Sequence, residues 1–226
     1  MSRFLHFVEP CSPIRAKEPP AGDAWLHEPK LDGYRLQVVK DGRQVRLYSR
    51  RGNDWTYRLP VLAEALMAIP APAVILDAEL CLPGADWAPD FYGLEAAIDE
   101  RQQDLAVCAF DMLHKDGTDM CSWPLTQRKQ VLAGLVQRAK VACLHLVASF
   151  PDGAELLASA ERLGLEGVVS KRRNARYRSG ECRDWRKVKT AAWREANRER
   201  WRAFDPHDRG GKRVFRVERA GEVKRA

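Results

Sequence analysis

Apolar residues recur along this chain in short segments, with a period of two in some segments and of three to four in others. A period of two predicts strands, and a period near 3.6 predicts helices. Strands are predicted at residues 25–30, 34–40, 44–49, 74–82, 105–113, 144–150, 166–171 and 185–189. Helices are predicted at residues 59–69, 91–98, 125–138 and 154–163.

The order of these segments indicates the fold class. Prolines at positions 10, 13, 19 and 20 make residues 1–24 an extended lead-in rather than a helix. Asp41-Gly42 joins two predicted strands as the turn of an antiparallel hairpin. The chain has no regular alternation of strands and helices and no glycine-rich Rossmann loop. We therefore predict an α+β domain with two mainly antiparallel sheets and flanking helices.

Composition narrows the functional class. With 226 residues, 45% of them hydrophobic, the chain can bury a substantial core. It has no apolar stretch that could span a bilayer and no signal-peptide pattern at its start, which favours a cytoplasmic location. Its six cysteines lack Cys-x-x-Cys spacing, so we expect reduced thiols. A net charge of +7 indicates a polyanionic partner.

One stretch carries recognisable chemistry. Residues 30–35 read Lys-Leu-Asp-Gly-Tyr-Arg, between two predicted strands. A protonated lysine is a poor nucleophile, so an enzyme that uses one must favour the neutral amine with nearby cations or by desolvation. Arg35 is a candidate cation, Asp32 could orient the lysine, and Gly33 permits a tight turn or a close backbone approach. The ordinary alternative is an Asp-Gly turn between two solvated side chains.

Further motifs follow in order along the chain. They are residues 49–52 (Ser-Arg-Arg-Gly), 76–79 (Leu-Asp-Ala-Glu), 110–113 (Phe-Asp-Met-Leu), 166–171 (Glu-Gly-Val-Val-Ser-Lys) and 185–189 (Trp-Arg-Lys-Val-Lys). With residues 30–35 they resemble the successive nucleotidyltransferase motifs of ATP-dependent DNA ligases. The amino-acid sequence around these motifs is most similar to the ligase module of bacterial non-homologous end-joining ligases. Six ordered motifs make a chance match improbable.

The resemblance implies a role for each matching residue. Lys30 would attack the α-phosphorus of ATP and become a lysyl-adenylate, with Asp32 as its catalytic partner. The residues that would bind ATP or AMP are Glu28, Lys30, Arg35, Arg50, Glu79, Phe110, Val168, Lys187 and Lys189. Glu28 would recognise the adenine edge, while Phe110 and Val168 would pack on the two faces of the base. Cations at Lys187 and Lys189 would hold the α-phosphate and favour the neutral form of Lys30.

The resemblance also implies metal and DNA sites. Glu79 and Glu166 would bind Mg²⁺ or Mn²⁺. The residues that would contact DNA are Arg35, Arg50, Arg51, Arg194, Arg198 and Arg202. Ordinary alternatives exist, since a phenylalanine such as Phe110 is usually core and a pair such as Lys187 and Lys189 is usually exposed. The order of the motifs outweighs those alternatives.

The chain departs from the family pattern after Thr190. Complete members continue into an oligonucleotide-binding (OB) barrel, and the 36 residues that follow are too few for one. We expect residues 1–190 to form the adenylation domain and residues 191–226 a basic helix and tail, without an OB domain. The helix is predicted at 191–204, with Trp193 and Trp201 on one stripe and arginines every four residues. The tail would either grip DNA phosphates or dock through its tryptophans.

The function expected from the sequence is that of an ATP-dependent DNA ligase or a stand-alone adenylation domain acting in DNA repair. Its partners would be nicked or broken double-stranded DNA and a separate DNA-end-binding or OB-containing protein, in a bacterial cytoplasm near the nucleoid. One alternative is an RNA ligase or RNA end-modifying nucleotidyltransferase. The other is a catalytically degenerate protein that binds DNA ends.

Overall fold

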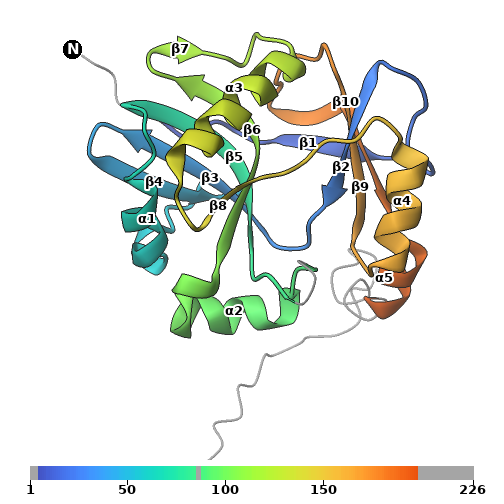
Figure 1. The fold of residues 1–226 in the computed structure, drawn as a ribbon, viewed down its shortest axis with the longest axis horizontal. Helices are drawn as coiled ribbons and strands as arrows, with labels where there is room; N and C mark the ends of the chain where they lie inside the picture. Colours follow the sequence, from blue (N-terminus) through green and yellow to red (C-terminus); the bar gives the residue numbers. More distant parts are fainter. Residues whose placement is uncertain (1–4, 85–87, 198–226) are drawn as a thin grey trace, which may run out of the picture.

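Two sheets form the framework of the molecule (Figure 1). The computed structural model describes residues 5–84 and 88–197. The four-stranded sheet has the order β1 (Cys11–Arg15), β10 (Gly180–Lys189), β9 (Gly167–Arg172) and β2 (Trp25–Lys30). The six-stranded sheet has the order β4 (Gln44–Ser49), β3 (Tyr34–Asp41), β5 (Ala73–Cys81), β6 (Ala106–Lys115) and β7 (Thr118–Asp119), with β8 (Leu144–Leu146) beside β6. Only the pairs β1–β10 and β6–β8 are parallel among the described strands, so the predicted α+β class is confirmed.

Five α-helices are present in the described part of the chain. They are α1 (Pro60–Leu66), α2 (Phe91–Glu100), α3 (Leu125–Ala139), α4 (Gly153–Arg162) and α5 (Ala191–Ala196), with short 3₁₀ turns at Thr56–Arg58 and Gln102–Asp104. Helix α3 packs on β6 and β8, and α4 packs on β9 and β2 (Figure 1). Asp90, Asp152 and Thr190 cap α2, α4 and α5, because their side chains accept hydrogen bonds from backbone N–H groups of the first turn.

Strand alternation divides the apolar residues into two clusters. On β5, Leu76, Ala78 and Leu80 face α1, α2 and α3 in one core. The opposite face of the six-stranded sheet packs against the four-stranded sheet and forms a second core. Asp77 and Glu79 alternate with Leu76, Ala78 and Leu80, so both side chains point into the space between the sheets.

Gly33 is required by a close approach between backbones. A Cβ atom at this position would lie 2.2 Å from the carbonyl oxygen of Leu80. The loop between β2 and β3 therefore runs directly against the end of β5, which fixes Lys30 and Asp32 relative to the six-stranded sheet. The motif glycine is explained here by packing against protein backbone.

Several predicted boundaries were wrong. The segment 1–24 was predicted as an extended lead-in with no strand assigned in it, and residues 11–15 form strand β1, because they pair with the distant β10. The predicted strand 144–150 ends at Leu146, where the chain leaves β6 and crosses to β2 through a bridge between Phe150 and His27. Helix α1 ends at Leu66, three residues earlier than predicted.

The remaining expectations concern the end of the chain and the thiols. The predicted helix 191–204 is described as far as Ala196, and its later part, with Trp201, Arg198 and Arg202, lies outside the described residues. All six cysteines are free thiols, as expected. Within residues 5–84 and 88–197, no helix is both long and apolar enough to cross a membrane.

Candidate active site

A cavity of about 840 Å³ lies between the two sheets. On β9 and β10 the residues that line it occupy alternate positions, since only every second residue of a strand faces the cavity, whereas residues 28–35 line it as a continuous run. Of the residues predicted as functional, those that line it are Glu28, Lys30, Asp32, Arg35, Arg50, Arg51, Glu79, Phe110, Glu166, Lys187 and Lys189. Residues from six separate sequence motifs therefore meet in one place.

Lys30, at the end of β2, is held by an acidic partner. Its Nζ donates to Oε2 of Glu166 at 2.6 Å, and Lys189 Nζ lies 2.6 Å from Oε1 of the same carboxylate. The Glu166 side chain is only 4% exposed, so its carboxylate is largely shielded from water. Burial lowers the pKa of Lys189, with Glu166 opposing that shift. One carboxylate thus joins the predicted nucleophile to a predicted phosphate-binding lysine.

Lys187 adds a further cation to this group. Burial lowers the pKa of Lys187, and the positive charges of Lys30 and Arg50 lower it further. A cluster of cations with one shared carboxylate is incompletely neutralised. The cavity is therefore suited to a ligand that carries several negative charges.

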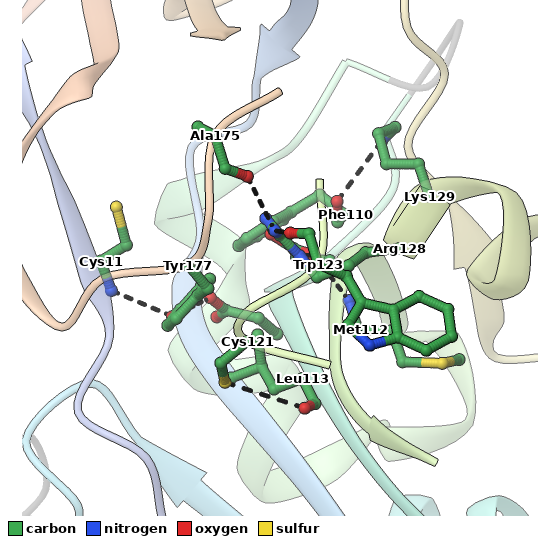
Figure 2. Close-up of polar contacts among 12 residues, drawn as sticks. Cys11, Phe110, Met112, Leu113, Cys121, Trp123, Arg128, Lys129, Ala175 and Tyr177 are labelled. Carbon is green, nitrogen blue, oxygen red and sulfur yellow. Dashed lines mark hydrogen bonds and ion pairs between the residues drawn. The ribbon is translucent and has the colours of Figure 1, made fainter. Parts of the chain in front are cut away.

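Arg35 is fixed by a buried aspartate. Its guanidinium forms two hydrogen bonds with Asp77, at 2.5 and 2.6 Å, and Asp77 also accepts from the Tyr177 hydroxyl at 2.6 Å. The same guanidinium lies 4.6 Å from the centre of the Phe110 ring. The Tyr177 hydroxyl accepts in turn from the Cys11 N–H (Figure 2). The orientation of Arg35 therefore depends on β1, β5 and the loop before β10.

Glu28 is buried among lysines that the sequence analysis did not single out. Its carboxylate lies 2.6 Å from Lys129 Nζ and 2.5 Å from Lys171 Nζ. Lys129 also donates to the Phe110 carbonyl (Figure 2). Lys171 lies 4.3 Å from the Phe110 ring centre, and burial lowers its pKa against the attraction of Glu28. Lys171 is the last residue of a recognised motif. Lys129 lies on α3 and belongs to no motif, so nothing in the sequence indicated that it is part of the site.

A buried ion pair beside the cavity holds the elements that carry Phe110 and Lys129 together. Arg128 and Asp111 are both fully buried and form two hydrogen bonds of 2.8 Å. Arg128 also donates to the carbonyls of Trp123 and Ala175 (Figure 2). Helix α3 is thereby tied to β6 and to the loop that follows β9. Asp111 of the Phe-Asp-Met-Leu motif therefore has a structural role: its ion pair with Arg128 holds Phe110 and Lys129 in place.

Val168 does not line the cavity, which corrects one prediction. Val168 is fully buried on the far face of β9, where it is paired with Pro29 and Val188. Val169 lines the cavity instead. The reason is strand alternation, because Lys171 faces the cavity and only Val169 shares its face.

The residues proposed for a metal lie close together without forming a complete site. Burial raises the pKa of Glu79 to about 7, against the attraction of Lys30 and Arg35, and the negative charge of Glu166 contributes in the same direction as burial. In the described residues, no group of three His, Cys, Asp or Glu side chains could hold a metal ion. Two carboxylates fit Mg²⁺ or Mn²⁺ where the phosphates of a bound substrate complete the coordination.

The remaining predicted residues lie at the rim or on α5. Arg50 and Arg51 are exposed at the mouth of the cavity, where Arg50 donates to the Ser12 hydroxyl at 3.2 Å. Arg194 is exposed and donates to the Lys189 carbonyl. Asp32 accepts a hydrogen bond of 2.9 Å from the Trp193 indole, so the one tryptophan of the predicted stripe that is described docks on the domain.

Fold and cavity together define a class: an α+β domain that surrounds a strand-end lysine with cations and a shared carboxylate. The chain belongs to the family of ATP-dependent DNA ligase domains, whose model matches residues 8–189. It is 39% identical over 175 residues to the multifunctional non-homologous end joining protein LigD of Pseudomonas aeruginosa, covering 76% of this chain and 21% of that protein. It is 36% identical over 179 residues to DNA ligase B of Mycobacterium tuberculosis, covering 74% and 35%.

Solved structures agree with this assignment. The ligase domain of M. tuberculosis LigD superposes with a TM-score of 0.70 at 32% identity, covering 80% of this chain and 60% of that domain. A mycobacterial DNA ligase D complexed with ATP superposes with a TM-score of 0.67 at the same identity, covering 80% and 59%. The chain thus spans about a fifth to a third of the curated relatives and three fifths of the solved domains.

Proposed function

We propose that this chain takes adenylate from ATP onto Lys30 and passes it to the 5′-phosphate of a DNA strand, so that a nick is sealed. The observation that carries the proposal is the position of Lys30 in the cavity. It shares Glu166 with Lys189 and lies beside Lys187, all within a recess between the sheets. Such an arrangement suits attack on a phosphorus atom that is surrounded by negative oxygens.

The first step forms one bond and breaks one. The neutral amine of Lys30 attacks the α-phosphorus, a phosphorus–nitrogen bond forms, and the bond to pyrophosphate breaks. The ammonium groups of Lys187 and Lys189 neutralise the oxygens on which charge develops. Lys30 must lose its proton first, and the Glu166 carboxylate, 2.6 Å from Lys30 Nζ, is placed to accept it.

The base and ribose would occupy the deeper part of the cavity. Glu28 would accept from the amino group of adenine, with Lys129 and Lys171 orienting its carboxylate. Phe110 and Val169 would enclose the base, and Glu79 would contact the ribose hydroxyls or the metal site. Arg35 would hold the ribose or the phosphates. The ion pair between Arg35 and Asp77 sets the direction from which its guanidinium approaches the ligand.

A divalent ion, Mg²⁺ or Mn²⁺, would be held by Glu166 and Glu79 and would neutralise phosphate charge when bound. Arg35, Arg50 and Arg51 would contact DNA phosphates at the mouth of the cavity, joined by Arg194, Arg198 and Arg202 of the C-terminal segment. Nicked or broken duplex DNA is the proposed partner. We extend the proposal to repair by end joining in a bacterial cytoplasm, aided by a separate DNA-end-binding or OB-containing protein.

Sealing of a nicked duplex tests the proposal. The full chain is incubated with ATP, Mg²⁺ and a labelled nick, with Lys30→Ala as the inactive control. We expect a joined strand with wild type and none with the variant. Joining of a nicked RNA duplex in preference to DNA would instead favour an RNA ligase. Tight DNA binding without adenylate transfer in either assay would favour a non-catalytic end-binding protein.

A further inference from the structure

Trp193 connects two parts of the candidate site that are far apart in the sequence. Its indole Nε1–H donates to Oδ2 of Asp32 at 2.9 Å. The ammonium of Lys189 lies 3.8 Å from the centre of the indole ring. Trp193 lines the cavity and is only 8% exposed. A single side chain therefore contacts the lysine motif with its edge and a phosphate-binding lysine with its face.

The position of Trp193 is set by contacts at the N-terminal end of α5. The Thr190 hydroxyl donates to the Leu165 carbonyl at 2.8 Å and accepts from the Trp193 N–H at 3.3 Å. The Glu161 carboxylate accepts from the backbone N–H groups of Ala191 and Ala192, both at 2.8 Å. These contacts join α5 to the end of α4 and to the segment that carries Glu166. The indole is thus built into the wall of the cavity.

The chemistry of the two contacts differs. The face of an indole attracts a cation, and this attraction strengthens where water is excluded. It holds Lys189 independently of Glu166, so Lys189 keeps a partner when the Glu166 carboxylate binds something else. The indole N–H restrains Asp32, which lies two residues after Lys30. Both contacts restrict side chains that surround the Lys30 amine.

We propose that Trp193 is a positioning residue for adenylation of Lys30, acting through Lys189 and Asp32. This inference rests on the proposed function. It extends the candidate site into residues that follow the last recognised motif, where the sequence carries no nucleotidyltransferase signature. It also gives α5 a role in adenylation, in addition to packing on the domain or contacting DNA.

The test compares two tryptophans in similar surroundings. Trp25 is 5% exposed and is stacked by Arg172 and Arg186 at 4.7 and 5.0 Å, but it does not line the cavity. The rate of lysyl-adenylate formation is measured in single turnover, as a function of ATP concentration, for Trp193→Phe, Trp193→Leu and the same two substitutions at Trp25. Thermal melting selects a temperature at which every variant is folded.

We expect Trp193→Leu to lower the rate at saturating ATP roughly 10- to 30-fold, because it removes both contacts. Trp193→Phe keeps an aromatic face for Lys189, so it should lower the same rate by only about threefold to tenfold. The ATP concentration for half-maximal rate should change less than the rate itself. Both Trp25 variants should retain the wild-type rate, since they remove packing of the same kind outside the cavity.

A double variant separates positioning from general damage. If Trp193 acts through Lys189, adding Trp193→Leu to Lys189→Met should cost less than the product of the two single losses. Equal rates for the Trp193 and Trp25 variants, or strictly multiplicative losses, would overturn the proposal. Wild-type protein that forms no adduct dependent on Lys30 would instead contradict the proposed function, and this inference with it.

Discussion

Neighbouring residues on one strand have opposite surroundings in this molecule. Val169 lines the cavity beside Lys171, whereas Val168 is buried against the next strands. The first position is available to a ligand, and the second contributes only to the core. A pair of identical side chains one residue apart therefore separates binding from stability.

We expect Val169→Ala to weaken ATP binding severalfold with little change in stability, because it removes a contact with the base. Val168→Ala should lower the free energy of unfolding by about 1–3 kcal/mol, since it leaves a void in a closed core. Denaturant unfolding and the ATP dependence of adenylation measure the two effects. The reverse assignment, with Val168→Ala the binding variant, would contradict the orientation of β9.

Glu79 gives the ligand-free protein a characteristic pH dependence. Its folded-state pKa of about 7 lies above the ordinary glutamate value of 4.5, mainly because burial disfavours the carboxylate. The stabilising effect of the protonated form is complete below about pH 4.5 and is lost as the pH rises through 7. In the presence of a chelator, Glu79→Gln should therefore be more stable than wild type at pH 8, by about 1–2 kcal/mol.

At pH 4.5 the two proteins should melt at similar temperatures, because Glu79 is then protonated in the folded wild type and the glutamine of the variant is uncharged at any pH. Thermal melting at the two pH values checks this expectation. A difference in melting temperature that does not change between pH 4.5 and pH 8 would show that the Glu79 carboxyl is not strained by burial.

At the scale of elements, one ion pair joins α3 to β6 and to the loop after β9. Arg128→Met would leave Asp111 charged and buried without its partner, and should cost about 3–5 kcal/mol of stability. The double change Arg128→Met with Asp111→Leu should recover much of that loss, because no buried charge remains. Denaturant unfolding of both variants measures the two changes in the free energy of unfolding. Equal instability of the two would mean that packing, not charge, dominates at this site.

The sequence predicted elements best where pairing is local. Strands β3 and β4 follow from alternation on both sides of Asp41-Gly42, and their bounds agree with the structure within one residue. Strand β1 was missed, because Pro13 and the prolines around it indicate only an extended chain and its partner β10 lies about 170 residues away. Local patterns carry no information about such a pairing.

At the scale of the molecule, the same distinction applies to the site. Each recognised motif contributes residues to one cavity, although Val168 does not line it. Lys129, Tyr177 and Trp193 were not predicted as site residues, because their contacts with Glu28, Asp77 and Asp32 span 100 or more residues. Only the fold brings them together. The division into a domain at 1–190 and a tail at 191–226 stays a prediction.

The charge at the mouth of the cavity should govern DNA binding. Replacing Arg50 and Arg51 by alanine should weaken binding to nicked duplex and reduce the salt dependence of the affinity by about two counterions. Arg43 and Arg138, which are exposed and do not line the cavity, provide the matched double variant. Equal loss from both pairs would point to diffuse attraction over the whole surface.

The most direct test of the central claim is covalent labelling of Lys30. Wild type, Lys30→Ala and Lys115→Ala are incubated with α-labelled ATP and Mg²⁺ or Mn²⁺ and separated on a denaturing gel, after intact mass has checked for adenylate already present. We expect label on wild type and on Lys115→Ala, and none on Lys30→Ala. Label retained by Lys30→Ala, or no adduct in wild type by either method, would contradict Lys30 as the nucleophile.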